Sequence, residues 1–465
     1  MAIGDLIIRY REEMIADLQK LLAIQSVASS ADGRYPFGAG PAAALQFMLE
    51  RARDFGLTAV NVDEYAGHAE IAGGNSIAGI LVHLDTVPAG EGWSVEPFAG
   101  TLRDGMIYGR GAIDNKGPAI SSLYALRALK EAGIQPNRTL RLIMGTSEET
   151  SPIDLNYYFE RYPIPDLSFT PDVGPAIFYA EMGIFTIELM KKYESTIPSP
   201  LLSIQGGLAA NMVPDRCLCR IQRDRLTMSD YELLMQRADS AGYKIELTES
   251  AKILQVTAHG KSAHGSVPQF GVNAVMQMID WLIGVNESFH TMNADIANTL
   301  RWILHYIGHE YDGQSLGIAC RDDITGALIV NLGKLSIDQR QATITLNIRH
   351  PATLDGAHVA ERLQQLALEH QFQLNLTQYG PPVYVPTDHP LITKLSRAHQ
   401  TIMGEPAQLV ATAGGTYAKF LGNQGVGYGG VWTEGYAHQA DERMRIDEWM
   451  TLSRIITQAA HEISQ

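Results

Sequence analysis

Two adjacent carboxylates follow an apolar stretch and are the most informative feature of this sequence. The apolar run 142–144 leads through Gly145 to Glu148 and Glu149. Neighbouring side chains in an extended segment diverge, so one carboxylate can bind a cation while the other moves protons. That division of labour suits metal-assisted hydrolysis. Taken alone, such a pair is more simply interpreted as a solvated acidic turn.

Further histidine and carboxylate side chains lie at the ends of other apolar or glycine-rich segments. They are His83 with Asp85, Asp114, Asp172 and, far downstream, His438. A single histidine near an aspartate is more often incidental than a metal ligand. Two imidazoles and at least three carboxylates together form a ligand set that suits zinc or a similar divalent ion. The combined pattern therefore predicts a metal site.

The sequence resembles a family of dinuclear metallopeptidases. This family includes PepV-type bacterial dipeptidases, carnosinases, acetylornithine deacetylases and succinyl-diaminopimelate desuccinylases. The resemblance spans nearly the whole chain and is closest to the PepV-like dipeptidases. The shared motifs are His83-Leu84-Asp85-Thr86-Val87-Pro88, Gly92-Trp93, Pro97-Phe98, Tyr108-Gly109-Arg110-Gly111-Ala112, Asp114-Asn115-Lys116-Gly117, Glu148-Glu149 and Gly260-Lys261-Ser262-Ala263-His264-Gly265.

The resemblance implies a set of ligands for two divalent ions. His83 and Asp172 would hold one ion. Glu149 and His438 would hold the other, and Asp114 would bridge the two. The expected ions are zinc, and manganese or cobalt would be served by the same ligands.

The resemblance also implies catalytic roles for two further acids. Glu148 would be the general base, which takes a proton from water and returns it to the leaving amine. Asp85 would bond the far nitrogen of His83 and fix its tautomer. The family further implies a cis peptide bond between Asp114 and Asn115.

Three positions depart from the family pattern. Ser147 stands where many relatives have an acid, and Asn115 where an aspartate is common. Glu149 is followed by Thr150-Ser151-Pro152 instead of glycine. None of these changes removes an implied ligand or the base. We expect them to bear on metal preference or on the pKa of Glu148.

Composition agrees with a soluble enzyme. The chain has 465 residues, of which 45% are hydrophobic, and its formal net charge is −15. The length favours two domains, and the charge argues against nucleic acid as a partner. The sequence shows no apolar run of roughly 18 residues and no signal peptide, so we expect no membrane partner. The three cysteines, Cys217, Cys219 and Cys320, read as reduced thiols, which favours the cytoplasm.

Apolar periodicity predicts an α/β fold. Helices are expected over 6–22, 41–55 and 118–132, and strands over 57–62, 68–72, 77–82 and 139–144. Their alternation predicts a mostly parallel sheet flanked by helices. Ligands of such sheets gather beyond the carboxyl ends of the strands.

The order of the implied ligands predicts a divided catalytic domain. Four of them precede residue 173, and the fifth is residue 438. We expect 1–180 and 382–465 to form one catalytic domain, and 181–381 to form an inserted α+β lid domain. Within the insert, strands are expected over 253–258 and 341–349, and helices over 271–283 and 357–368.

The resemblance places the remaining substrate contacts mainly in the insert. His264 would stabilise the developing oxyanion, and Asn211 would hydrogen-bond substrate. Arg349, which alone would read as a surface ion pair, would grip the terminal carboxylate of the substrate. The turn Gly414-Gly415-Thr416 resembles a substrate-contacting turn of the family. The insert is long enough to reach back over its own site, so we expect His264 to act in cis within a monomer.

Three other patterns do not support a second site. His305 and His309 lack the glutamate of a helical zinc motif, and Cys217-x-Cys219 has no partner pair. The glycine-rich segment 425–430 is not followed by the helix of a dinucleotide site.

These observations predict a cytosolic dinuclear metallopeptidase that hydrolyses unblocked dipeptides. One alternative is an N-acyl amino acid deacylase of the same family, which the ligands alone do not separate from a dipeptidase. The other alternative is a non-enzymatic peptide-binding relative.

Overall fold

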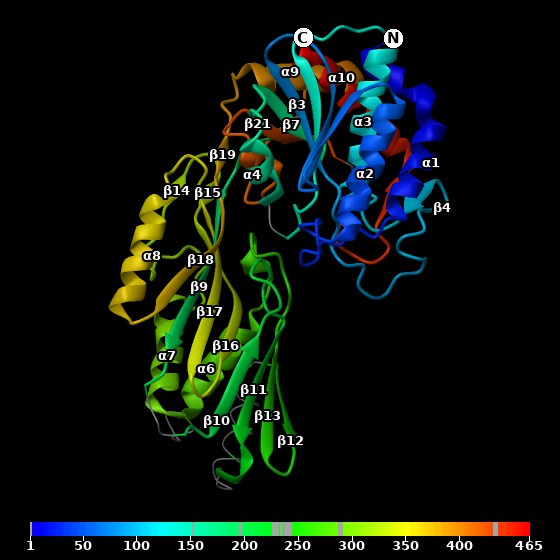
Figure 1. Cartoon of the computed structure of the whole chain (residues 1–465). Helices are drawn as coiled ribbons and strands as arrows, with labels where there is room; N and C mark the ends of the chain where they lie inside the picture. The colour runs from blue at the N-terminus through cyan, green and yellow to red at the C-terminus, as the bar shows by residue number, and fades with distance from the viewer. Residues whose placement is uncertain are drawn as a thin grey trace. The chain divides into compact units, whose positions relative to one another are not determined.

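The structure is a computed structural model, and it describes residues 2–150, 153–194, 198–225, 232, 236, 244–286, 292–430 and 436–465. The chain forms two compact units (Figure 1). The split unit comprises Met1–Glu181 and Val383–Gln465. The inserted unit comprises Met182–Pro382.

The split unit carries helices on both sides of its insertion point. The elements before the insert are η1 (Ile3–Tyr10), α1 (Arg11–Leu22), α2 (Ala39–Asp54), β1 (Thr58–Val62), β2 (Ala66–Ile71), β3 (Ile77–His83), β4 (Thr101–Arg103), β5 (Met106–Tyr108), α3 (Lys116–Glu131), β6 (Thr139–Gly145), α4 (Ile153–Phe159), β7 (Leu167–Thr170) and β8 (Ile177–Glu181). Those after it are β19 (Val383–Tyr384), α9 (Pro390–Met403), β20 (Leu409–Thr412), η4 (Tyr417–Phe420), β21 (Gly425–Tyr428), β22 (Arg443–Arg445) and α10 (Ile446–Ser464).

A mixed nine-stranded sheet forms the centre of the split unit. Its order is β1-β2-β6-β3-β7-β21-β8-β19, with β20 paired to β8. The neighbours β6, β3, β7 and β21 run parallel to one another. The predicted α/β class, with a parallel sheet flanked by helices, is therefore confirmed at the centre of the sheet.

The edges of this sheet differ from the predicted parallel arrangement. Strands β1 and β2 pair antiparallel, and β2 also runs antiparallel to β6. The reason is local: β1 and β2 are joined through Asp63 and Glu64, which both have positive φ, in a short connection with no room for a crossover helix. The two strands were expected within a mostly parallel sheet, and they form an antiparallel hairpin.

Strand β3 is buried on both faces, as its continuous apolar sequence requires. Ile80 and Val82 point into the main core, which they share with residues of α1, α2, α3 and α10. Leu81 belongs to a smaller cluster on the other face, with Tyr158 of α4 and Tyr417 of η4. Packing on both faces fixes the strand and hence the position of His83, its last residue.

The inserted unit is an eight-stranded antiparallel sheet with helices. The strand order is β12-β13-β11-β10-β16-β17-β9-β18. Its core includes side chains of α6, α7 and α8. The elements are β9 (Gly183–Lys192), β10 (Leu201–Gly206), β11 (Arg216–Gln222), η2 (Arg223–Arg225), β12 (Lys244–Glu249), β13 (Ile253–His259), η3 (Pro268–Phe270), α6 (Ala274–Asn286), α7 (Ala294–Tyr306), β14 (Arg321–Asp322), β15 (Gly326–Ala327), β16 (Ile329–Ile337), β17 (Gln341–His350), α8 (Ala357–Glu369) and β18 (Gln373–Gly380).

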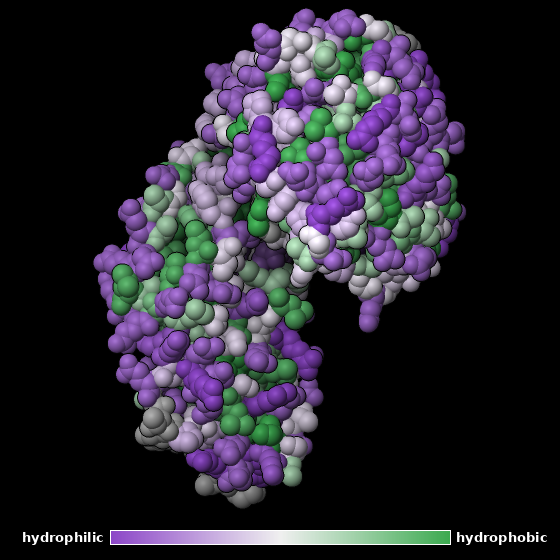
Figure 2. All heavy atoms as spheres, in the orientation of Figure 1, coloured by the Kyte–Doolittle hydropathy of each residue, from purple (hydrophilic) through white to green (hydrophobic). Residues whose placement is uncertain are grey.

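The displayed surfaces of both units are mainly hydrophilic, with hydrophobic residues interspersed in small groups (Figure 2). Among the described helices, none combines the length and the apolar character needed to cross a membrane.

Candidate metal centre

Three neighbouring parallel strands direct polar side chains to one edge of the sheet. His83 ends β3, Glu148 and Glu149 follow β6, and Asp172 follows β7. Because parallel strands end at the same edge, these side chains are brought together by topology alone. Asp114 joins them from the loop between β5 and α3.

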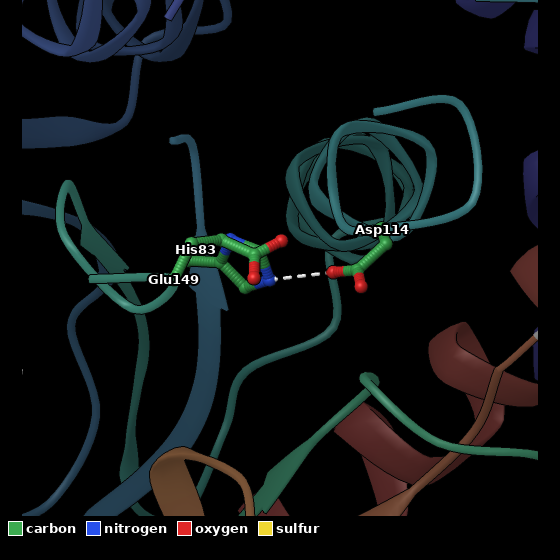
Figure 3. A group of neighbouring side chains, drawn as sticks. All are labelled: His83, Asp114 and Glu149. Atoms are coloured by element: carbon green, nitrogen blue, oxygen red, sulfur yellow. Dashed lines mark hydrogen bonds and ion pairs between the residues drawn. The ribbon is translucent and has the colours of Figure 1, made fainter. Parts of the chain in front are cut away.

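Asp114 lies between two imidazoles. Its Oδ1 is 2.8 Å from Nε2 of His83, and its Oδ2 is 3.0 Å from Nε2 of His438. Figure 3 shows Asp114 facing His83, with Glu149 beside the imidazole. The ligand atoms of His83, Asp114 and Glu149 all lie within 4.8 Å of one another.

The other two implied ligands reach the same cluster. Oδ1 of Asp172 lies 3.5 Å from Nε2 of His83. Nε2 of His438 lies 2.9 Å from Oε1 of Glu149. The structure therefore brings together all five side chains that the family resemblance implied as ligands.

Asp85 occupies a different hydrogen-bonding position from the one implied. Its two carboxylate oxygens accept the backbone N–H groups of Glu148 and Glu149, each at 3.0 Å. Nδ1 of His83 lies 3.1 Å from the main-chain oxygen of Asp85 and 3.5 Å from the nearer carboxylate oxygen. The carbonyl oxygen of Asp85 is thus closer to the ring than its carboxylate is. Asp85 thus holds the Glu148–Glu149 backbone as well as lying beside His83.

The segment after Asp114 also contributes to the centre. The peptide bond between Asp114 and Asn115 is cis, as the family resemblance implied. The Asn115 side-chain amide donates to the main-chain oxygen of Pro171 and to Oδ1 of Asp172, both at 2.9 Å. The asparagine that departs from the family pattern therefore orients an implied ligand.

The surrounding carboxylates raise the pKa of both imidazoles of the cluster. Burial would lower the pKa of His83, but Asp172 and Asp114 outweigh burial and raise that pKa well above its ordinary value. Hydrogen bonds to Asp114 and Glu149 raise the pKa of His438 to about 10.

The carboxylates respond to burial and to one another. Burial, together with the charge of Asp114, raises the pKa of Asp172 to about 6. Burial raises the pKa of Glu148 well above its usual range, opposed by the imidazole of His83. Burial also raises the pKa of Glu149, although the hydrogen bond to His438 opposes this rise.

The donor set fits divalent cations. Burying several carboxylates together is unfavourable unless cations compensate them. Here the nearest compensating groups are two imidazoles, whose Nε2 atoms can exchange a proton for a metal. Nitrogen and oxygen donors in this number are those that zinc, manganese and cobalt accept.

The predicted substrate turn is fixed at one end by a buried acid. Thr416 donates its backbone N–H and its hydroxyl to Glu181, at 3.0 and 2.7 Å. Thr416 also caps η4 by accepting the N–H of Ala418. Gly414 donates its N–H to the hydroxyl of Thr412, while Gly415 is exposed. The hydroxyl of Thr416 is thus engaged within the protein, and the two glycines form the accessible part of the turn.

Two of the predicted residues of the inserted unit lie in adjoining loops. The N–H of Gly265 donates to the main-chain oxygen of Asn211 at 2.7 Å, and Met212 forms a β-bridge with His264. Nδ1 of His264 lies 2.6 Å from the hydroxyl of Ser266. These contacts place Asn211 and His264 side by side in sequence-distant loops.

Arg349 is buried on the neighbouring strand β17. Its side chain is only 3% exposed, and burial lowers its pKa to about 10. Its Nε donates to Asn347 at 3.2 Å, and Asn347 is directly opposite Asn331 on β16. Asn331 donates to the main-chain oxygens of Ala210 and Met212, which flank Asn211. The structure therefore gathers all three predicted residues of the insert into one part of that unit.

Besides Asp85, the buried acid Glu442 supports the centre, and the sequence analysis did not identify it. One carboxylate oxygen of Glu442 accepts the backbone N–H groups of Ile113, at 2.9 Å, and Asp114, at 3.3 Å. The other oxygen pairs with the buried Arg110. Arg110 lies in the glycine-rich motif before Asp114, and Glu442 follows His438 by four positions. Their signal was an arginine in a glycine-rich loop, which needs a buried partner.

A cluster of imidazoles and carboxylates at the carboxyl edge of a parallel sheet is typical of metal-dependent hydrolases. The family model described as Peptidase family M20/M25/M40 matches residues 79–462. The chain belongs to this family and is a peptidase. Membership implies divalent metal ions.

A curated relative is similar in sequence over the full length of this chain. The Bacillus subtilis (strain 168) protein named "Putative dipeptidase YtjP" is 31% identical over 473 residues, which cover 99% of this chain and 99% of that protein.

Solved structures share the fold. An M20 family metallo-carboxypeptidase from Sulfolobus solfataricus aligns with a TM-score of 0.62 at 17% identity, covering 97% of this chain and 99% of that one. Human carnosine dipeptidase 1 aligns with a TM-score of 0.61 at 15% identity, covering 100% and 98%.

Proposed function

We propose that this peptidase is a dipeptidase that hydrolyses unblocked dipeptides with two divalent ions, zinc in the first instance. The name of the full-length relative supports the dipeptidase activity, and the geometry of the centre supports the use of metal ions.

One observation carries the metal part of the proposal. The two oxygens of Asp114 face different imidazoles, those of His83 and His438. A carboxylate that meets a separate nitrogen donor on each oxygen has the arrangement of a bridge between two cations. His83 with Asp172, and His438 with Glu149, would complete the two sets of ligands.

Bound ions in such a centre polarise the scissile carbonyl and lower the pKa of water. Glu148 would accept a proton from the attacking water at its carboxylate and return it to the leaving amine. The hydrogen bond from the Glu148 N–H to Asp85 supports this role, because it fixes the backbone that carries the base.

We assign the residues of the inserted unit by their chemistry. His264 would stabilise the developing oxyanion, and Asn211 would hydrogen-bond substrate. Arg349 would bind the terminal carboxylate of the dipeptide, for which a planar guanidinium offers two parallel donors. In the split unit, Gly415 would offer its backbone N–H to substrate, and Gly414, whose own N–H donates to Thr412, would let the chain approach it closely. The burial of Arg349 and its hydrogen bond to Asn347 support a guanidinium that is held in a fixed position.

We also propose that the enzyme acts in the cytoplasm as a monomer. Its three cysteines are free, which suits a reducing compartment. Cell fractionation, and light scattering of the purified zinc-loaded protein, test the two parts of this proposal.

A substrate panel tests the proposed reaction. The purified zinc-loaded protein is assayed with free dipeptides, N-acetyl amino acids and N-succinyl amino acids. We expect kcat/KM for the best dipeptide to exceed that for any N-acyl amino acid by about 100-fold or more, because a site that binds free termini rejects blocked ones. The reverse preference would make the enzyme an N-deacylase, and turnover of neither class would remove the proposal.

A further inference from the structure

The loop that carries Glu148 and Glu149 is held by a second buried carboxylate, that of Asp154. Its Oδ2 accepts the backbone N–H groups of Thr146 at 2.8 Å and Ser147 at 2.9 Å. The next two N–H groups of the loop donate to Asp85. Four consecutive backbone donors are thus divided between two acids, and the loop has little freedom to shift.

Asp154 is placed to act only within the protein. It lies in the first turn of α4 and is fully buried. Its Oδ1 accepts the N–H of Leu155. Burying a carboxylate is costly unless hydrogen bonds compensate it, so this residue requires its donors.

Tyr417 supplies a further donor from a distant part of the chain. Its hydroxyl donates to the same Oδ2 of Asp154, and its side chain is 1% exposed. The edge of its ring also meets His83, with ring centroids 6.1 Å apart and planes at 84°. Tyr417 therefore touches both an implied ligand and the acid that holds the Glu148 loop.

Gly145 makes room for this contact. A Cβ added at Gly145 would lie 2.0 Å from the Tyr417 hydroxyl oxygen and 2.6 Å from Oδ2 of Asp154. Any larger residue at the end of β6 would separate the hydroxyl from the carboxylate. The glycine at the end of β6 is therefore required for the hydrogen bond between Tyr417 and Asp154.

We propose that Asp154 and Tyr417 are positioning residues for the reaction: they fix residues 146–149 so that Glu148 can act as base and Glu149 as ligand. This inference rests on the proposed roles of Glu148 and Glu149. It assigns a function to a buried acid and a buried phenol that neither bind substrate nor ligate metal.

The test uses Tyr417→Phe and Asp154→Asn in the full-length zinc-loaded protein. Tyr417→Phe removes one hydroxyl and keeps the ring, while Asp154→Asn keeps the shape and removes the charge. We expect each variant to lose about 10- to 100-fold in kcat with little change in KM, and to bind zinc about 10- to 100-fold more weakly, as loss of such outer partners typically does. The double variant should lose less than the product of the two single losses, because the two groups share one hydrogen bond.

Tyr158→Phe is the matched control. Tyr158 is also fully buried, but its hydroxyl is hydrogen-bonded to His68, at 2.9 Å, instead of to Asp154. This variant should keep wild-type kcat and zinc affinity.

Zinc affinity is measured by competition with a chromophoric chelator, which needs no turnover. If Tyr417→Phe matches Tyr158→Phe in both kcat and zinc affinity, the proposal is wrong. It is also wrong if Tyr417→Phe and Asp154→Asn only lower the melting temperature or fail to fold while Tyr158→Phe folds. If Glu148→Gln kept full activity, the proposed function would fail instead, and the zinc measurements would still report how Glu149 is held.

Discussion

His438 and Glu149 meet at 2.9 Å although 289 positions separate them in the chain. One belongs to the segment after the inserted unit and the other to the loop after β6. Their contact closes the group of donors around Asp114.

Replacing the proposed base should separate catalysis from metal binding. In Glu148→Gln the loop and the neighbouring ligand are kept, but the side chain no longer accepts a proton. We expect kcat to fall by about 10²- to 10⁴-fold with two zinc ions still bound. Steady-state kinetics and metal analysis check this, with the exposed Glu160→Gln as control. Wild-type kcat in Glu148→Gln would exclude it as the base.

Removal of metal should abolish activity and lower stability. A chelator would leave the carboxylates of the centre compensated only by imidazolium groups. Zinc at about 100 times its Kd should add about 2.7 kcal/mol to the free energy of unfolding, as expected for any ligand of the native state alone. Melting curves with and without zinc measure this gain. Asp114→Asn should show much less of it, and equal gains would argue against Asp114 as a ligand.

Mixing two inactive variants tests whether His264 acts in cis. We expect a mixture of His264→Ala and Glu148→Ala to remain inactive. If His264 acts in cis, each active chain must carry both His264 and Glu148, and neither variant does. His259→Ala is the control, since His259 is in the same segment and partly exposed beside Glu246. Recovery of activity on mixing would show that the histidine comes from a partner chain.

Substitution of Arg349 should affect the recognition of a free carboxyl terminus. Arg349→Lys keeps a charge but loses the planar pair of donors. We expect KM for a dipeptide to rise by about tenfold or more, and the rate with the matching dipeptide amide to change little. Equal effects on the two substrates would contradict this assignment.

His68 should make the stability of the split unit depend on pH. It is 2% exposed, and burial together with the charge of Arg141 lowers its pKa to about 4. Its ring also contacts Tyr158 and Tyr162. Between pH 4 and its unfolded value near 6.5 the unfolded chain binds more protons, so the free energy of unfolding falls as pH falls.

The size of this effect is about 3 kcal/mol at most. Chemical unfolding at pH 7 and pH 4.5 measures the difference between wild type and His68→Gln. The variant should lose less stability on acidification. An identical loss in both proteins would show that the pKa of His68 is the same in the folded and the unfolded chain.

The site residues at strand ends were predictable from sequence. The buried Asp154, which hydrogen-bonds the backbone of the Glu148 loop, was not. His83 and Asp172 follow apolar runs, and the parallel order of those runs brings them together. Asp154 carries no such pattern, because an acid in the first turn of a helix is common at protein surfaces. Only the fold shows that its carboxylate faces Thr146 and Tyr417.

The antiparallel edge was missed for a related reason. The sequence from 57 to 72 shows two short apolar segments, and nothing in their periodicity separates a hairpin from two crossover strands. The available signal was the length of the connection between the two segments, which leaves no room for a crossover helix.

The division of the split unit also has a consequence for synthesis. A ribosome must translate the whole of Met182–Pro382 before His438 exists. Until then a nascent chain carries four of the five donors and no β21 to pair with β7. The inserted unit is contiguous, so its whole sequence is available for folding before the second part of the split unit has been translated.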